Sequence, residues 1–197
     1  MSRRWVDVTR PLGPDSEVYP GDPEVRFELR EGDGFFITAI RMGSHSGTHL
    51  DAPRHLDRQG VSVDEIAPEI LCGTARLVVP GADPLGPDEL HRHGLSGEHR
   101  VLFRTRTPAG PGSLTPDGAA WIRDRGIRLI GWDRLSIDPV EDPALPAHRI
   151  LLEAGVIVAE GLDLLDLPPG RYDLIALPLR LVGLDGSPAR ILVRSLG

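Results

Sequence analysis

The stretch from His45 to His55, which reads HSGTHLDAPRH, is the feature that most restricts how this chain can fold. The intervals in residue number between His45, His49, Asp51 and His55 are all even. In an extended chain, side chains alternate between two faces, so all four would point the same way. In a helix, His45 and His49 would share a face, whereas Asp51 and His55 would point elsewhere. The spacing, together with an internal glycine and proline, therefore predicts a strand or extended loop rather than a helix.

Three imidazoles and one carboxylate that converge in this way are typical metal ligands. Together they suit zinc, manganese or ferrous iron, and two histidines with one acid form a common open catalytic set. The alternative is a polar loop whose histidines are satisfied by hydrogen bonds, which is the ordinary interpretation of a single histidine. Because four ligand-type residues fall on one face, the stretch favours a metal site.

Composition excludes several classes of function. A chain of 197 residues is expected to form a single domain, residues 1–197, and its net charge of −7 argues against a nucleic acid or an anionic membrane as partner. All 22 basic residues are arginines, which excludes lysine-based catalysis. The only cysteine, Cys72, excludes an internal disulfide and a four-cysteine zinc site. The N-terminus lacks an apolar signal region and no run is long enough to cross a membrane, so we expect a soluble, cytoplasmic protein.

The hydrophobic pattern predicts strands alternating with short helices. Residues 25–29 and 35–42 are expected to form a half-buried hairpin that leads into the histidine stretch. Ser62, followed by Glu65, predicts a capping box and a helix to about Leu71. Further strands are expected at residues 5–8, 74–79, 100–104, 127–132, 156–159, 172–181 and 189–193, and further helices at 87–93, 115–126 and 148–154. This order indicates an α/β arrangement.

Candidates for the remainder of a site lie outside the histidine stretch. Glu160 ends the apolar run VIVAE, and a buried carboxylate needs a partner such as a metal, because an unpaired buried charge is costly. Glu160 could equally reach water at the end of a strand, and His148 could be an exposed histidine near a helix start. Tyr19, in a loop rich in proline and glycine, could wall a pocket or anchor the packing.

The stretch HSGTHLDAPRH resembles the HxGTHxDxPxH signature of the metal-dependent cyclase family, which includes bacterial kynurenine formamidases. Further similar segments cover nearly the whole chain: WVDVTRPL, YPGDP, RVLFRT, IRLIGWDRLSIDP, LPAHRILLEAG, VAEGLDL, GRYDLIALPLRL and DGSPARILV. The resemblance implies a compact single α/β domain, in which a mixed β-sheet with barrel-like curvature is flanked by helices. It also implies a homodimer or a larger homo-oligomer.

The resemblance further implies a centre for two divalent ions, with zinc expected and manganese as the alternative. His45, His49 and Asp51 would bind the first ion. Asp51 would bridge to a second ion held by His148 and Glu160.

His55 would be the catalytic general acid and base near this centre. Tyr19 would bind the substrate, because it stands where the kynurenine formamidases of the family carry a tryptophan. The central loop GWDRLSIDP departs from the family pattern G-[IVT]-D-T-P-S-x-D-P at Trp132, Arg134 and Leu135. We therefore expect Trp132 to lie in a wall of the substrate pocket.

These features predict a hydrolase that cleaves a small aromatic amide with metal-activated water, and N-formylkynurenine is the leading substrate. The altered central loop favours an alternative, a polyketide-type cyclase that uses the same metal site. A third possibility is a metal- or ligand-binding protein without catalysis, although all ligand positions and His55 are filled. A GxSxG serine motif does not occur in the chain.

Overall fold

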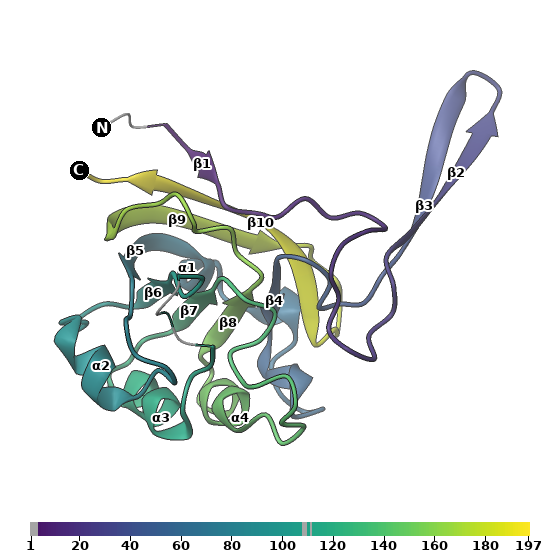
Figure 1. Ribbon diagram of the computed structural model, residues 1–197. Helices are drawn as coiled ribbons and strands as arrows, with labels where there is room; N and C mark the ends of the chain where they lie inside the picture. The colour runs from purple at the N-terminus through teal and green to yellow at the C-terminus, as the bar shows by residue number, and fades with distance from the viewer. Residues whose placement is uncertain (1–3, 108–109, 111) are drawn as a thin grey trace.

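The computed structural model describes residues 4–107, 110 and 112–197, and its main feature is a closed mixed β-barrel flanked by short helices (Figure 1). Within these residues, seven strands form a ring in the order β10-β4-β8-β7-β6-β5-β9, and β1 adds to β10. The strands are β1 (Val6–Asp7), β2 (Arg26–Gly32), β3 (Phe35–Arg41), β4 (His49–Asp51), β5 (Cys72–Val78), β6 (Arg100–Phe103), β7 (Leu129–Trp132), β8 (Ile157–Glu160), β9 (Gly170–Pro178) and β10 (Gly186–Ser195). The helices are η1 (Pro53–His55), η2 (Val63–Glu65), α1 (Pro68–Leu71), α2 (Pro87–Arg92), α3 (Pro116–Asp124) and α4 (Pro146–Glu153).

One half of the barrel is parallel. Strands β5 to β8 run in the same direction, and α2, α3 and α4 lie together on one side of them (Figure 1). Successive side chains of these strands alternate between two cores. Leu129 belongs to the core that also contains residues of β9 and β10, whereas Ile130 and Trp132 belong to the core shared with the helices. The strands are therefore buried on both faces, as expected for a parallel sheet.

The other half of the barrel is antiparallel and receives the histidine stretch. β10 pairs with β4 through its first residues and with β9 through the others. β4 also pairs with β8, so that His49 lies opposite Glu160, the last residue of a parallel strand. The centre of the histidine stretch therefore lies where the sheet changes from parallel to antiparallel, at the carboxyl ends of the parallel strands. Open α/β sheets often bind ligands in the corresponding place.

Several predicted elements differ in the structure. The predicted helix from Ser62 to Leu71 is wrong, because η2 and α1 are separate short helices. Pro68 begins α1, and the residue before a proline is pushed out of the helical region, as Ala67 is (φ −63°, ψ 129°). Only His49 to Asp51 of the histidine stretch form a strand, whereas His45 lies in a turn and His55 ends the 3₁₀ helix η1. The remaining predicted strands and helices are found, with ends shifted by a few residues.

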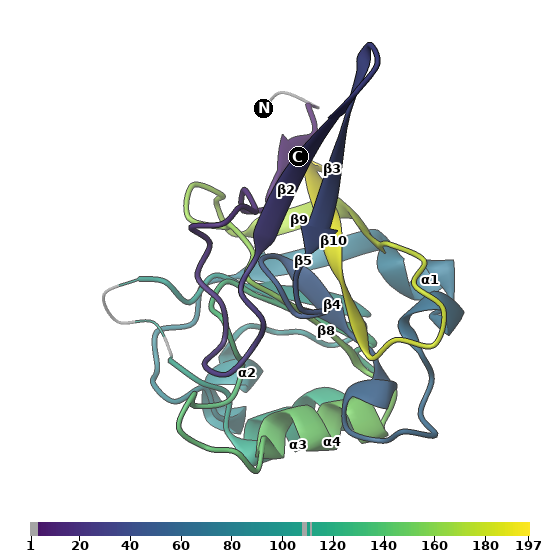
Figure 2. The same ribbon diagram turned by 90° about the vertical axis from the view of Figure 1, so that its right-hand side faces the viewer.

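The β2–β3 hairpin forms a sheet of its own that projects away from the barrel (Figures 1 and 2). The prediction of a half-buried hairpin is wrong, because Phe27 and Leu29 are 43% and 68% exposed. Sequence alternation identifies an apolar face but does not say whether the rest of the chain covers it. Among the described residues, no helix is both long and apolar enough to cross a bilayer.

Candidate metal centre and catalytic site

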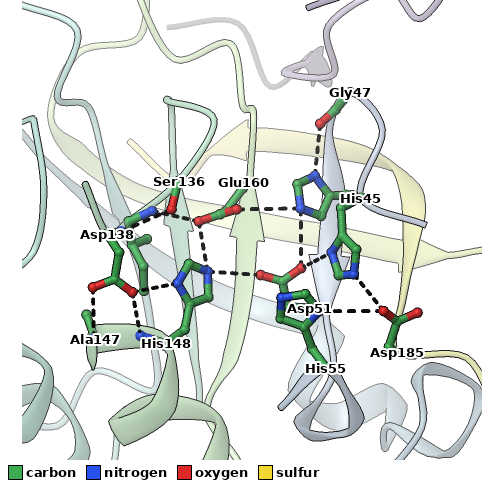
Figure 3. Close-up of polar contacts among 12 residues, drawn as sticks. His45, Gly47, Asp51, His55, Ser136, Asp138, Ala147, His148, Glu160 and Asp185 are labelled. Carbon is green, nitrogen blue, oxygen red and sulfur yellow. Dashed lines mark hydrogen bonds and ion pairs between the residues drawn. The ribbon is translucent and has the colours of Figure 1, made fainter. Parts of the chain in front are cut away.

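Three elements deliver ligand-type side chains to one point (Figure 3). β4 supplies His49 and Asp51, β8 ends with Glu160, and the first turn of α4 carries His148. His45 joins them from the turn before β4. All five side chains that the sequence suggested as metal ligands therefore meet in the structure.

Close packing of two loops fixes this arrangement. Gly161, which follows Glu160, has a φ of +68°, and a Cβ atom added to it would lie 2.5 Å from the carbonyl oxygen of Gly47. A side chain would therefore force the two loops apart. The Thr48 hydroxyl donates a 2.6 Å hydrogen bond to the carbonyl oxygen of Gly161. The glycine and threonine of the HSGTH motif thus hold His49 beside Glu160.

The ligand atoms form two groups that share Asp51. In the first group, Asp51 Oδ1 lies 2.6 Å from His45 Nδ1 and 3.2 Å from His49 Nε2. In the second, His148 Nε2 lies 3.3 Å from Asp51 Oδ2 and 3.2 Å from Glu160 Oε1. Within each group, one ligand atom from each residue lies within 4.8 Å of the others. Nitrogen and carboxylate oxygen atoms gathered in this way fit a divalent metal.

Hydrogen bonds on the outer side of two imidazoles set their tautomers. His49 Nδ1 lies 3.0 Å from the carbonyl oxygen of Gly47, and His148 Nδ1 lies 2.8 Å from Asp138 Oδ2. When each Nδ1 donates its proton outward, Nε2 faces the shared carboxylates. Metal-ligating histidines usually have such a partner, which orients the ring and makes it more basic. Asp138 also accepts hydrogen bonds from the backbone N–H groups of Ala147 and His148, and so holds the start of α4.

Without an ion, protons balance the buried charges. Burial opposes the charged form of His45, but the Asp51 carboxylate and hydrogen bonds to Asp185 and Asp51 raise its pKa to about 9. Burial likewise opposes protonation of His49, but Asp51 and Glu160 raise its pKa to about 10. Burial opposes ionisation of Asp51, but the neighbouring histidines hold its pKa well below the usual range. Because a divalent ion is positive, it can replace these protons.

His55 stands beside this centre, held by a carboxylate from a distant part of the chain. Its ring centre lies 4.1 Å from that of His45 and 6.2 Å from that of His148. Asp185 Oδ2 lies 3.5 Å from His55 Nδ1 and 3.0 Å from His45 Nε2. Hydrogen bonds from His45 and His55 lower the pKa of Asp185, so its carboxyl group remains charged. The position of Asp185 is fixed by its own carbonyl oxygen, which accepts a hydrogen bond from the backbone N–H of Ala52.

A cavity of about 170 Å³ opens onto these residues. Its walls combine the polar centre with an apolar and aromatic side formed by Tyr19, Leu135 and Leu145. The Tyr19 hydroxyl donates a 3.0 Å hydrogen bond to the carbonyl oxygen of Val140, which holds the ring in place. Since a cavity of about 150 Å³ can hold benzene, this volume suits one aromatic ring.

Comparison with known proteins agrees with the geometry. Residues 6–139 match the cyclase family model, which is described as "Putative cyclase". The chain belongs to the cyclase family. It is 36% identical to the kynurenine formamidases of Salinibacter ruber, with 96% of each chain covered, and of Geobacillus thermodenitrificans, with 100% of each covered.

Solved structures of cyclase-family hydrolases share the fold. A potential metal-dependent hydrolase with cyclase activity has a TM-score of 0.84 at 33% identity, with 96% of each chain covered. Isatin hydrolase A of Labrenzia aggregata, bound to benzyl benzoate, has a TM-score of 0.85 at 28% identity. That match covers 98% of this chain and 94% of the hydrolase. The mixed α/β fold predicted from the resemblance is thereby confirmed.

The structure does not place Trp132 in the cavity wall, which corrects the prediction of a substrate contact. Its side chain is fully buried and packs against Phe103, with ring centres 5.7 Å apart. The physical reason is strand alternation, which turns Trp132 toward the helices. Arg134 donates to the Thr105 hydroxyl and carbonyl oxygen and lines a neighbouring cavity instead. Of the three departures in the central loop, only Leu135 lines the cavity beside the metal centre in this member of the cyclase family.

Sequence reasoning missed three residues of the site. Asp138 and Asp185 are not among the predicted site residues, although an acid between a buried strand and a helix start could indicate Asp138 as a helix cap. Nothing in the sequence around Leu145 indicates that this residue belongs to the site. It has a φ of +47°, which is strained for a leucine, and it lines the cavity directly before α4. Strained residues often mark functional sites.

Proposed function

We propose that this member of the cyclase family hydrolyses a small aromatic amide, with N-formylkynurenine as the leading substrate. The observation that carries the proposal is the position of two ligand groups, joined by Asp51, at the wall of a cavity sized for one aromatic ring. Two similar proteins, a kynurenine formamidase and an isatin hydrolase, support the proposal, because both names denote hydrolysis of an aromatic amide. If N-formylkynurenine is the substrate, the enzyme would act in tryptophan breakdown in the cytoplasm.

We also propose that the centre holds two divalent ions, zinc or manganese. His45, His49 and Asp51 would hold one, and Asp51, His148 and Glu160 the other. Such ions supply a Lewis acid and lower the pKa of water toward about 7. The donor set supports this assignment, because each ligand histidine has a carbonyl or carboxylate partner on its outer side.

The chain's own residues then handle the proton that amide cleavage requires. The aryl amine that leaves must gain a proton, and His55 is the side chain placed to donate it. When Asp185 accepts a hydrogen bond from His55 Nδ1, the other ring nitrogen, Nε2, remains available to exchange a proton with the substrate. Asp185 therefore acts as a positioning residue that orients His55.

The apolar side of the cavity orients the substrate. Tyr19, Leu135 and Leu145 would contact the aromatic ring, so that the amide bond is directed toward His55 and the metal ligands. Burial of a ring against such walls also excludes water from the reacting group, which strengthens the electrostatic interactions at the centre.

The polyketide-type cyclase loses most of its support from the central loop. Trp132 and Arg134, two of the departures that favoured it, do not line the cavity beside the metal centre. A binding protein without catalysis is also less favoured, because His55 and Asp185 add a proton-transfer pair to the ligand set. Hydrolysis therefore remains the proposed activity.

The test is turnover of N-formylkynurenine by protein stripped of metal and then reloaded with zinc or manganese. We expect formate release at about 1–10³ per second that depends on the added ion. Related aryl formamides and lactams form the control panel for substrate class. Absence of turnover on the whole panel, in protein shown to bind close to two ions per chain, would contradict the hydrolase proposal. Activity toward a poly-ketone in the same protein would favour the cyclase.

A further inference from the structure

A third group of ligand-type side chains lies beside the two groups that meet at Asp51 (Figure 3). His45, His55 and Asp185 each offer one ligand atom, and these atoms lie within 4.8 Å of one another. Two imidazoles and one carboxylate form the donor set of many open sites for divalent metals. His55 and Asp185 belong to neither of the groups that form the proposed two-ion centre.

The spacing of the ligand atoms in this third group suits a shared ion. Asp185 Oδ2 lies 3.0 Å from His45 Nε2 and 3.5 Å from His55 Nδ1. Two ligand atoms that are each about 2.1 Å from a tetrahedral zinc ion lie about 3.4 Å apart. An N–H···O hydrogen bond usually spans about 2.7–3.2 Å, so the contact from His55 is long for a hydrogen bond. That separation is, however, ordinary for two ligands of one ion.

His45 can serve two sites because its ring nitrogens face different carboxylates. Nδ1 lies 2.6 Å from Asp51 Oδ1, and Nε2 lies 3.0 Å from Asp185 Oδ2. With Nδ1 directed to the two-ion centre, Nε2 carries the remaining ring proton, and a further ion displaces that proton to solvent. Neutral His55 needs to lose no proton, because its single proton can lie on Nε2 while Nδ1 binds the ion. The extra proton that His45 loses makes this site weaker than the two-ion centre.

Solvent reaches the third group more easily than the two-ion centre. The side chains of His45, His55 and Asp185 are 14%, 25% and 39% exposed. The side chains of Asp51 and Glu160 are only 1% and 4% exposed. His45 and His55 also line the cavity in which the substrate is proposed to bind. An ion from solution can therefore reach the third group after the two-ion centre is filled.

We propose that His45, His55 and Asp185 bind a further zinc ion when zinc is in excess, and that this ion inhibits the enzyme. A metal on Nδ1 of His55 occupies the lone pair that a second ring proton would take. His55 then cannot form the doubly protonated ring from which a general acid donates. Inhibition presupposes the proposed function, whereas binding of the ion does not.

Equilibrium dialysis against zinc, followed by mass spectrometry of the bound metal, tests the site. At free zinc well above the level that fills the two-ion centre, wild-type protein should bind one more ion per chain than His55→Ala protein. Dialysis into zinc-free buffer should remove this weaker ion first, so that both proteins then hold the same number. Equal zinc content of the two proteins in excess zinc would overturn the site.

Two further variants separate the site from nonspecific binding. Asp185→Asn keeps the shape of the side chain but removes its charge, and should weaken binding of the additional ion by at least about 10–100-fold, the usual loss for a changed partner of a metal ligand. His91→Ala, at an exposed position on α2, is the matched control and should bind as many ions as the wild type. Loss of the additional ion in His91→Ala would assign it to the surface and overturn the proposal.

Turnover measured against free zinc tests the inhibition. Activity should reach a plateau as the two-ion centre fills and should fall again as the additional ion binds, with half-inhibition where dialysis shows half-occupancy. Magnesium, which prefers oxygen ligands, is the control and should not inhibit. Full activity with the additional ion bound would overturn the inhibitory role. Should no substrate be turned over, the proposed function fails, whereas the dialysis result still decides the site.

Discussion

The metal centre and the β2–β3 hairpin depart from the usual distribution of polar and apolar residues in opposite directions. At the centre, Asp51 and Glu160 are carboxylates that are at most 3% exposed. On the hairpin, Leu29 and Phe36 are apolar side chains that are nearly 70% exposed. A buried charge needs an opposite charge, and an exposed apolar face needs a cover. The first region therefore points to an ion, and the second to a cover that the described residues of this chain do not supply.

The largest effect is expected at the residue shared by both ligand groups. Asp51→Ala should remove both ions and lower turnover by at least about 10³-fold, since the metal contributes several kcal/mol to the reaction. Metal content by mass spectrometry and formate release are the measurements. The control is Asp133→Asn, because Asp133 is also buried but accepts hydrogen bonds from Thr105 and the backbone of Arg106. An Asp51→Ala protein that retains two ions would disprove the shared-ligand arrangement.

His55→Ala should leave the ions in place and reduce kcat by about 10²–10⁴-fold, as expected when a general acid and base is lost. Steady-state kinetics and metal content, measured on the same preparation, check this. His91→Ala, at an exposed position on α2, should change neither quantity. If His55→Ala loses metal instead, His55 is a ligand and its assignment as a proton donor is wrong.

Asp185→Asn should lower kcat by about 10–100-fold with little change in KM, because His55 and His45 lose the carboxylate that orients them. The pH profile of kcat should shift as well, which a purely structural residue would not cause. Asp64→Asn is the matched control, because Asp64 holds the same loop through the backbone N–H of Gly183 without touching the histidines. Equal losses in both variants would mean that loop position, rather than Asp185, controls the rate.

Metal binding should compete with protons. The raised pKa values of His45 and His49, about 9 and about 10, mean that both rings are protonated at pH 7 in stripped protein. Each displaced proton should raise metal affinity about tenfold per pH unit until pH reaches about 9. Stripped protein should also lose stability progressively as pH rises from about 6.5, the ordinary pKa of a histidine in the unfolded chain, to about 9 to 10, where the folded histidines lose their protons. Calorimetry in two buffers that differ in ionisation enthalpy checks the proton release, and binding without it would contradict the prediction.

The smallest effect on catalysis is expected at Trp132, which belongs to neither region. Truncation of a buried tryptophan to alanine lowers the free energy of unfolding by about 3–5 kcal/mol. Trp132→Phe should lower it by less and should leave KM unchanged. Tyr19→Ala, at the cavity wall, should do the reverse and raise KM roughly tenfold with little loss of stability. Denaturant unfolding and kinetics separate the two. A raised KM in Trp132→Phe would restore Trp132 to the substrate pocket.

Local patterns in the sequence determined the parts of the site that depend on short spacing. His45, His49 and Asp51 lie in the two proposed ligand groups, and the fourth residue, His55, lies beside them in a separate group with His45 and Asp185. The argument from an extended chain was only partly correct, because only β4 is a strand. The turn before it and the 3₁₀ helix after it still direct the outer histidines to the same point.

Tertiary structure alone decided which distant groups complete the site and which faces remain exposed. Asp185 reaches His45 across 140 residues of sequence, and no local pattern encodes that approach. Alternation along a strand shows that Trp132 and Ile130 share a face, but only the packed helices show that this face is buried. The same limit applies to the hairpin, whose apolar face was readable from the sequence. Whether the barrel or a second chain covers that face depends on where the hairpin points, which the sequence pattern does not specify.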